Sequence, residues 1–415
     1  MEERFFIKEM PNGMTLLGQP MEQVSSAAMM MLIPAGAAHD PPGCEGAAAV
    51  ASEWMSRGAG DRDTRQLNDA LDSLGAQHDQ SVLSEHVHLG SAQLGRNLQA
   101  VLEIFADIVR RPRLAEAAFG PSRDLTIQDL AELEDEPMRK CNVLLREKFY
   151  PHPLGRCAYG TAESLQAMTP DAVRAHLARR LTPRGTILAV AGKIDWQRFC
   201  DLVGKRFGDW DAEPNEPVRP AAPAGGVTFI EKPTAQAQIA LAHRSVTVGS
   251  EHYYPARVAE TILSGGMSGR LFTEVREKRG LAYSVSSRYQ SLKDHAGMFT
   301  YAGTRPELAQ QTFDVTIAEL RRLAEGIEPD ELTRAKTQLK SGLVMASEST
   351  SGRAGALASD WYHLGRVRTL AELSRRIDEV TAEQVLDYLR AWPPEKFTVL
   401  VIGPEPLDTR TAEEA

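Results

Sequence analysis

Apolar residues recur at helical spacing in two long segments of this 415-residue chain. In the segment 97–110 they fall on one face of a helix, and Pro112 marks its end. The segment 308–323 lies about 211 residues later and carries Phe313, Val315, Ile317 and Leu320 at comparable spacing. Both patterns predict amphipathic helices that pack against a core.

Shorter apolar runs predict strands at 27–33, 82–91, 239–248 and 283–290. Several of these runs lie beside turns that contain Gly or Asn, which is typical of antiparallel hairpins. Strands and long helices do not alternate one for one along the chain, as they would in a parallel sheet. We therefore expect α+β domains, each a mainly antiparallel sheet with helices packed on one face.

A helix followed by an apolar strand occurs twice with the same offset. Thr169 and Thr381 are each placed to cap a helix, and the strands that follow end at Gly192 and Gly403. The two threonines are 212 residues apart and the two glycines 211. Because the offset agrees at both ends of the unit, the pattern predicts an internal duplication with two homologous domains.

The clearest break in composition is the segment 211–226, which is rich in Pro and Gly and lacks apolar periodicity. It divides the chain into an N-terminal domain at 1–212, a linker at 213–227 and a C-terminal domain at 228–404. The remaining residues, 405–415, are polar and acidic, and we expect a flexible tail there.

Composition excludes several classes of function. The net charge of −9 argues against a nucleic-acid-binding protein, since phosphate contacts need clustered Lys and Arg. Apolar runs are much shorter than the ~20 residues of a membrane helix, and the first residues do not resemble a secretory signal. The four cysteines show no C-x-x-C spacing, so free thiols and a cytoplasmic location are expected.

The segment 265–285 runs from a Gly-rich turn through a helix into a strand. Gly280 suits the left-handed position that ends a helix, which places Arg276 in the last helical turn and Tyr283 at the start of the strand. The residues alone leave two interpretations open: an Arg and a Tyr directed at one polar group, or a solvated basic helix end. The glycines fit neither of the common phosphate-binding patterns.

Histidines give no clear metal site. His86 and His88 would share one face of a strand, but no third ligand can be identified from the sequence. The segment 360–363, which ends in His363, is equally unsupported. The chain has no H-E-x-x-H, H-x-x-E-H or G-x-S-x-G pattern.

Several motifs together resemble those of the insulinase/pitrilysin family of zinc peptidases, in particular its short bacterial members related to the mitochondrial processing peptidase. They lie at 12–13, 34–37, 152–156, 191–195 and 276–283. The resemblance covers nearly the whole chain and implies two homologous α+β domains, in agreement with the repeat.

The same resemblance places the family's zinc motif, H-x-x-E-H, on the segment 46–58. Ala49 then stands at the first ligand position, Ser52 at the catalytic base and Glu53 at the second ligand, while Asp129 stands near the third. Two carboxylates without an imidazole make a poor zinc site, and a serine cannot replace the base. We therefore expect no zinc and no peptidase activity in this chain alone.

In two-subunit members of this family, the chain without zinc carries an Arg and a Tyr seven residues apart that hold the substrate carbonyl at the partner's zinc site. Arg276 and Tyr283 match this spacing. The resemblance thus implies a non-zinc-binding subunit that pairs with a homologous zinc-bearing H-x-x-E-H subunit as a heterodimer and acts on peptides. The alternatives are a catalytically inactive scaffold and a peptide-binding homo-oligomer, such as a homodimer.

Overall fold

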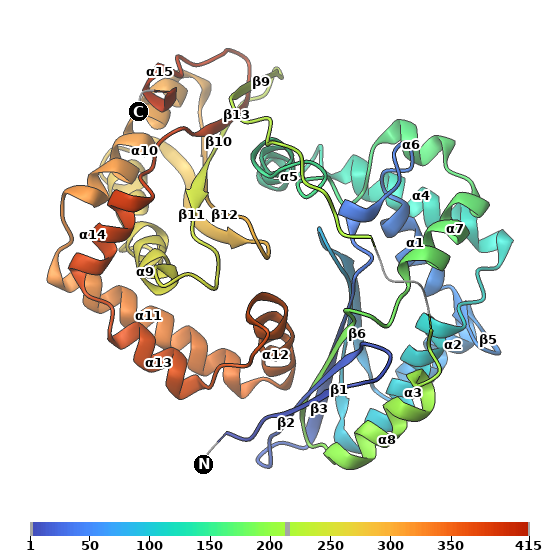
Figure 1. Ribbon diagram of the computed structural model, residues 1–415. Coiled ribbons are helices and arrows are strands. Elements are labelled where there is room, and N and C mark those ends of the chain that lie inside the picture. Colours follow the sequence, from blue (N-terminus) through green and yellow to red (C-terminus); the bar gives the residue numbers. More distant parts are fainter. Residues whose placement is uncertain (1–2, 212–215, 414–415) are drawn as a thin grey trace. The chain divides into compact units, whose positions relative to one another are not determined.

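The computed structural model describes residues 3–211 and 216–413 and divides into two compact units (Figure 1). The first unit comprises Met1–Glu132, Arg156–Pro220 and Ala346–Arg368. The second unit comprises Leu133–Gly155, Ala221–Met345 and Thr369–Ala415. Each unit is built around one sheet.

The sheet of the first unit has six strands in the order β1-β2-β8-β3-β7-β6. These strands are β1 (Phe6–Glu9), β2 (Thr15–Pro20), β3 (Ser26–Ile33), β6 (Gln77–Val82), β7 (Val87–Leu94) and β8 (Ile187–Gly192). Only β2 and β8 pair in parallel. A separate two-stranded ribbon is formed by β4 (Gly58–Ala59) and β5 (Arg62–Asp63).

The sheet of the second unit has five strands in the order β11-β12-β10-β13-β9. They are β9 (Val227–Glu231), β10 (Ala237–Ser245), β11 (Ala282–Ser291), β12 (Ala296–Thr304) and β13 (Thr398–Gly403). Here only β13 and β9 pair in parallel.

The two sheets have the same strand order once β2, β8, β3, β7 and β6 are matched with β9, β13, β10, β12 and β11. The parallel pair is in the same place in both. Gly192 pairs with Pro20, the last residue of β2, and Gly403 pairs with Glu231, the last residue of β9. This agreement confirms the duplicated α+β fold that the sequence predicted.

Helices of the first unit cover one face of its sheet. They are α1 (Ala47–Met55), α2 (Thr64–Ser73), α3 (Leu98–Arg110), α4 (Glu116–Glu132), α6 (Ala162–Ala167), α7 (Pro170–Arg180) and α8 (Trp196–Phe207). Short 3-10 turns lie at Ala37–His39 and Gly95–Asn97. The apolar face of α3, predicted from its periodicity, is buried in the core through Val101, Leu102 and Phe105.

The second unit has a corresponding helical layer. It contains α9 (Tyr253–Ser264), a π-helix (Phe272–Glu277), α10 (Ala309–Arg322), α11 (Pro329–Glu348), α13 (Leu370–Asp378), α14 (Ala382–Ala391) and α15 (Arg410–Glu413). Short 3-10 turns lie at Pro306–Leu308 and Leu323–Glu325. Phe313 and Ile317 of α10 are fully buried, as the periodicity of that segment predicted.

Two helices cross between the halves of the sequence (Figure 1). Helix α12 (Thr350–Leu364), from the C-terminal half, packs on β2, β3 and β8 of the first sheet. Helix α5 (Pro137–Phe149), from the N-terminal half, packs on β10, β12 and β13 of the second. Side chains of a strand alternate between its two faces, so these helices bury the faces that the other helices leave open.

This exchange of α5 and α12 between the halves of the sequence changes two expectations, one on the faces of the sheets and one on the domain boundaries. Each sheet carries helices on both faces rather than on one, because Leu17, Leu32 and Ile187 form a second apolar layer against Leu357 of α12. The compact units also differ from the halves 1–212 and 228–404, since 133–155 and 346–368 belong to the unit of the opposite half.

The linker and the tail both make contacts with the second unit. Residues 213–215 of the linker lie outside the described residues, and Gly225 N donates a hydrogen bond to Lys148 O within the second unit. In the tail, Ala412 is fully buried and Thr411 O accepts a hydrogen bond from Arg321 of α10. The tail to Glu413 therefore packs on α10, which differs from the expected flexible segment.

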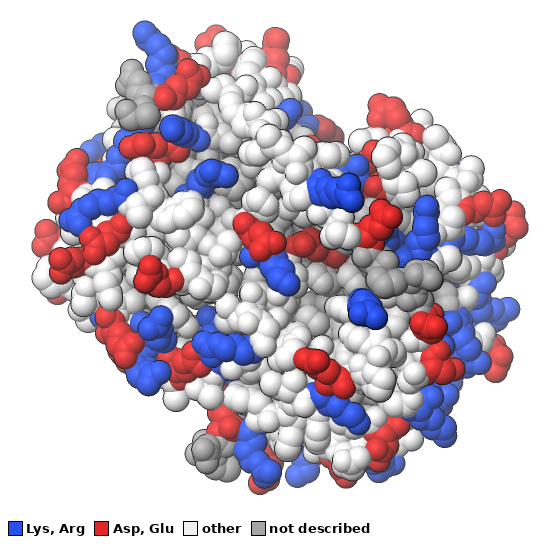
Figure 2. All heavy atoms as spheres, viewed as in Figure 1, with Lys and Arg blue, Asp and Glu red and all other residues white. Residues whose placement is uncertain are grey.

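No helix in the described part of the chain is long and apolar enough to cross a membrane. Acidic and basic side chains are interspersed over the face shown in Figure 2, without a large basic patch. All four cysteines are free, as the sequence predicted.

Candidate functional site

Helix α1 carries most of the positions that the family's zinc motif would occupy. Its first turn is fixed by Asp40, whose carboxylate accepts hydrogen bonds from Gly46 N at 2.8 Å and Ala48 N at 2.9 Å. Burial raises the pKa of Asp40 to about 7, although these hydrogen bonds favour its charged form. Val50 and Trp54 hold the other side of the helix in the core.

The residues at the motif positions do not form a metal site. Ala49 offers no ligand atom, and Ser52 is 4% exposed, with a hydroxyl that has no hydrogen-bond partner among the described residues. Glu53 accepts hydrogen bonds from Arg57 one turn later, at 2.8 Å from Nε and 2.5 Å from Nη2. The Arg57 guanidinium therefore already neutralises the negative charge that this carboxylate would offer to a metal ion.

Asp129, near the expected third ligand position, lies on α4, which packs against α1. The donor set of the site is thus two carboxylates with no imidazole or thiolate, and one carboxylate is already paired with Arg57. Over residues 3–211 and 216–413, no three His, Cys, Asp or Glu side chains are grouped to hold a metal ion. These residues do not fit a zinc ion.

His88 lies on β7, whereas His86 lies in the turn before this strand, so the two histidines do not share a strand face as the sequence predicted. Both are engaged in other contacts. His88 Nδ1 lies 3.2 Å from Asp79 Oδ2 and 3.3 Å from Ser81 Oγ, and burial lowers the pKa of His88. A Ser–His–Asp relay needs the serine and the aspartate on different ring nitrogens, so this set cannot act as one. The His86 ring packs edge-on against Tyr362, with 4.8 Å between the ring centroids.

The π-helix that bears Arg276 is firmly held in the second unit. Leu271 and Val275 are fully buried in its core. Arg270 makes a two-pronged ion pair with Glu331 of α11, at 2.8 Å from Nε and 2.7 Å from Nη2. Gly280 has φ +61°, the left-handed conformation predicted for the residue that ends the helix.

Arg276 itself is exposed, and its guanidinium lies 4.9 Å from the centroid of the Phe272 ring. Within the described part of the chain, this guanidinium has no hydrogen-bond or ion-pair partner. Its neighbours differ, because Lys278 and Arg279 both pair with Glu274 at 2.7 Å. Arg276 is thus the basic residue of this helix end whose donors remain available to a ligand.

Tyr283 lies across the turn, near the start of β11, an edge strand of the second sheet. The pairing of β11 with β12 shifts by one residue between Ala282 and Ser284, so Tyr283 occupies a β-bulge. Such bulges redirect a side chain out of the regular ladder. Tyr283 is 57% exposed, and its hydroxyl has no partner among the residues that the structure describes.

The described geometry defines a duplicated α+β protein whose two sheets share one strand order. Two models of one family match the chain: "Insulinase (Peptidase family M16)" over residues 17–162 and "Peptidase M16 inactive domain" over residues 167–339. The chain belongs to this family, the insulinase/pitrilysin-type peptidases.

Relatives and solved structures agree with this membership. An uncharacterized zinc protease of Mycobacterium tuberculosis is 29% identical, over 95% of this chain and 92% of the relative. The uncharacterized zinc protease YmxG of Bacillus subtilis is 28% identical, over 95% and 97%. The fold matches that of a peptidase M16 inactive domain from Pseudomonas fluorescens, with a TM-score of 0.89 and 20% identity over 98% of this chain and 99% of that one. A protease from Helicobacter pylori gives the same TM-score at 18% identity, over 98% and 100%.

Sequence reasoning missed the partner of Glu53. The sequence does contain a signal for this pair, because a Glu followed four residues later by an Arg on a helix has the spacing of an ion pair. The structure adds that the Arg57 guanidinium contacts this carboxylate through both Nε and Nη2.

Proposed function

We propose that this chain is the non-zinc-binding subunit of a heteromeric M16 metallopeptidase, inactive by itself, and that Arg276 and Tyr283 act at the zinc site of a homologous partner. The observation that supports the proposal most is the pair of available donors on either side of the turn at Gly280. The Arg276 guanidinium and the Tyr283 hydroxyl have no partner among the described residues, whereas neighbouring basic residues are paired.

The two side chains would bind the carbonyl oxygen of the peptide bond to be cleaved. A zinc ion in the partner subunit would supply the Lewis acid. Arg276 and Tyr283 donate hydrogen bonds to the oxygen as it gains negative charge, which stabilises the transition state more than the ground state. The Phe272 ring and the buried residues of the π-helix limit the positions open to the guanidinium, so less reorganisation is needed at the moment of reaction.

The experiment is reconstitution with a homologous chain from the same genome that carries H-x-x-E-H. The mixture should cleave a fluorogenic peptide, and each chain alone should not. Loss of one donor of this kind typically lowers turnover about 10²–10³-fold, so Arg276→Ala and Tyr283→Phe should each have an effect of that size. Arg276→Lys should recover little, because an ammonium lacks the planar fork of a guanidinium.

Arg288→Ala is the matched control, since Arg288 is an exposed arginine on the same edge strand. It should leave turnover unchanged, and all variants should still assemble in size-exclusion chromatography. If Arg276→Ala and Tyr283→Phe cleave at the parental rate in an assembled complex, the catalytic role is refuted. An inactive scaffold would then be the better account of this chain.

A further inference from the structure

The duplication places the same hairpin turn in both sheets. Leu83-Ser84-Glu85-His86 joins β6 to β7, and Leu292-Lys293-Asp294-His295 joins the matching strands β11 and β12. In each turn the backbone N–H of the leucine donates to the carbonyl of the histidine at 2.8 Å. Both turns therefore present an acidic residue followed by a histidine at the same end of equivalent sheets.

In the first unit this turn is occupied by a tyrosine of the chain itself. The Tyr362 hydroxyl, on α12, donates a hydrogen bond to Glu85 Oε2. Its ring packs edge-on against His86, with 4.8 Å between the centroids. In the first unit, therefore, a turn with an acidic residue followed by a histidine binds a phenol.

In the second unit the residue at the corresponding position carries no phenol, and the hydroxyl of the next residue, Tyr150, donates to Gln290 O. Pro137 and Thr350 begin α5 and α12 and are 213 residues apart, and the same offset pairs Phe149 with Tyr362. Phe149 has no hydroxyl and packs against Phe299, with 5.0 Å between the ring centroids. The Asp294 carboxylate consequently has no hydrogen-bond donor within the part of the chain that the structure describes.

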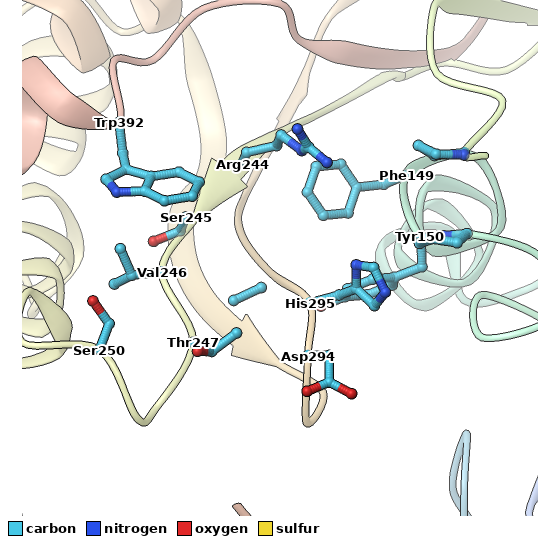
Figure 3. A pocket seen from close by; sticks show the side chains of 13 residues that line it. Phe149, Tyr150, Arg244, Ser245, Val246, Thr247, Ser250, Asp294, His295 and Trp392 are labelled. Atoms are coloured by element: carbon cyan, nitrogen blue, oxygen red, sulfur yellow. The ribbon is translucent and has the colours of Figure 1, made fainter. Parts of the chain in front are cut away.

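A cavity of about 260 Å³ opens beside this second turn, wholly within the second unit (Figure 3). Asp294 and His295 lie at one end of it, and Arg244 of β10 lies at the other, with the Trp392 indole on a side wall. Asp294 and Arg244 line one cavity but do not pair with each other, nor does either pair elsewhere among the described residues. The cavity is smaller than those that hold drug-sized ligands, so it fits a single residue.

We propose that this cavity binds a tyrosine residue with a free carboxylate, either as the amino acid or at the C-terminus of a peptide. The carboxylate pairs with the Arg244 guanidinium, the ring lies between Trp392 and His295, and the phenol donates to Asp294 as Tyr362 does to Glu85. The site is separate from Arg276 and Tyr283 and does not depend on the function proposed for them.

Calorimetric titration of the full chain with Gly-Gly-Tyr tests the proposal. One site per chain is expected. Gly-Gly-Tyr amide, which lacks the carboxylate, and Gly-Gly-Phe, which lacks the hydroxyl, should each bind about ten- to a hundredfold more weakly, the range for hydrogen bonds to charged groups. Free tyrosine forms a separate arm: equal affinity assigns the site to the amino acid, and weaker binding assigns it to the peptide end.

Arg244→Gln should weaken Gly-Gly-Tyr and leave the amide unaffected, and Asp294→Asn should reduce the preference for Tyr over Phe. Glu251→Gln, an exposed acidic residue outside the lining, is the charge-matched control and should change nothing. The proposal is overturned by the absence of saturable Gly-Gly-Tyr binding. It is equally overturned by binding that both pocket variants leave unchanged, or by equal affinity for the Tyr and Phe peptides.

Discussion

Glu53 and Arg57 illustrate how single residues decide the chemistry of a shared fold. The Glu53 carboxylate is paired with a guanidinium one turn away, and Ala49 and Ser52 stand where the resemblance places the other ligand and the base. Two carboxylates without an imidazole do not form a zinc site of useful affinity.

We expect the purified chain, dialysed against buffer containing zinc and then against metal-free buffer, to hold no stoichiometric zinc by elemental analysis. The combined variant Ala49→His, Ser52→Glu, Glu53→His and Asp129→Glu restores the donor set of the family motif and should retain about one zinc per chain. One zinc per parental chain would contradict this account, and His86 and His88 would then be the first residues to substitute.

His243 gives a prediction on pH. It is fully buried on β10 against Phe397, and burial lowers its pKa from 6.5 to about 4. Between these values the unfolded chain binds a proton that the folded chain does not, so the free energy of unfolding falls as pH drops from 6.5 to 4. The loss from this residue is about 3 kcal/mol.

His243→Leu should remove that part of the pH dependence. Urea unfolding of parent and variant at pH 7 and pH 4.5 provides the measurement, and the difference between the two proteins isolates His243. This comparison is needed because burial also lowers the pKa of His39 to about 4 and of His176 to about 3, while it raises that of Asp40 to about 7. An equal loss of stability in both proteins on acidification would refute the prediction.

At the scale of elements, the π-helix depends on the ion pair between Arg270 and Glu331. The pair is largely buried, with side chains 10% and 17% exposed, and the guanidinium also donates to Gly326 O at 2.7 Å. The guanidinium lowers the pKa of Glu331, in line with a contact that favours the charged form. The ion pair links helix α11 to the beginning of the segment that carries Arg276.

Arg270→Met should therefore cost about 3 kcal/mol of unfolding free energy, since it leaves a largely buried carboxylate unpaired. Arg279→Met, which breaks the more exposed pair with Glu274, serves as the control and should cost less than about 1 kcal/mol. Similar losses in the two variants, measured by urea unfolding, would show that burial does not distinguish these pairs.

For the whole molecule, the exchange of α5 and α12 makes each compact unit depend on both halves of the sequence. Without α12, the first sheet would expose the apolar side chains of Leu17, Leu32 and Ile187 to water. Residues 1–220 expressed alone should therefore aggregate or bind a hydrophobic dye. Expressed together with residues 221–415, they should co-purify as a complex.

Leu357→Asp in the C-terminal piece should abolish this co-purification, because it places a charge in the buried layer. Ala356→Asp, an exposed position one residue away on the same helix, is the matched control and should have little effect. A cooperatively folding 1–220 fragment that does not bind its complement would mean that the exchange contributes little to stability.

Apart from the strand expected at 82–91, which contains the turn between β6 and β7, the sequence alone determined the predicted helices, the predicted strands and the duplication. These follow from local signals, since periodicity, capping residues and Gly280 act within a few residues, and the repeat of Gly192 at Gly403 preserves the same local pattern. The spacing of Arg276 and Tyr283 was likewise visible, and the structure adds that their donors are available.

Only the tertiary structure decided which helix covers which sheet. The apolar pattern of a strand carries no information on the source of the helix that covers it, and in each unit one covering helix comes from a distant segment. The same holds for the tail, whose acidic composition did not reveal the buried Ala412, and for the cavity beside Asp294. Each of these features arises from contacts between residues far apart in the chain, where geometry rather than local propensity sets the free energy.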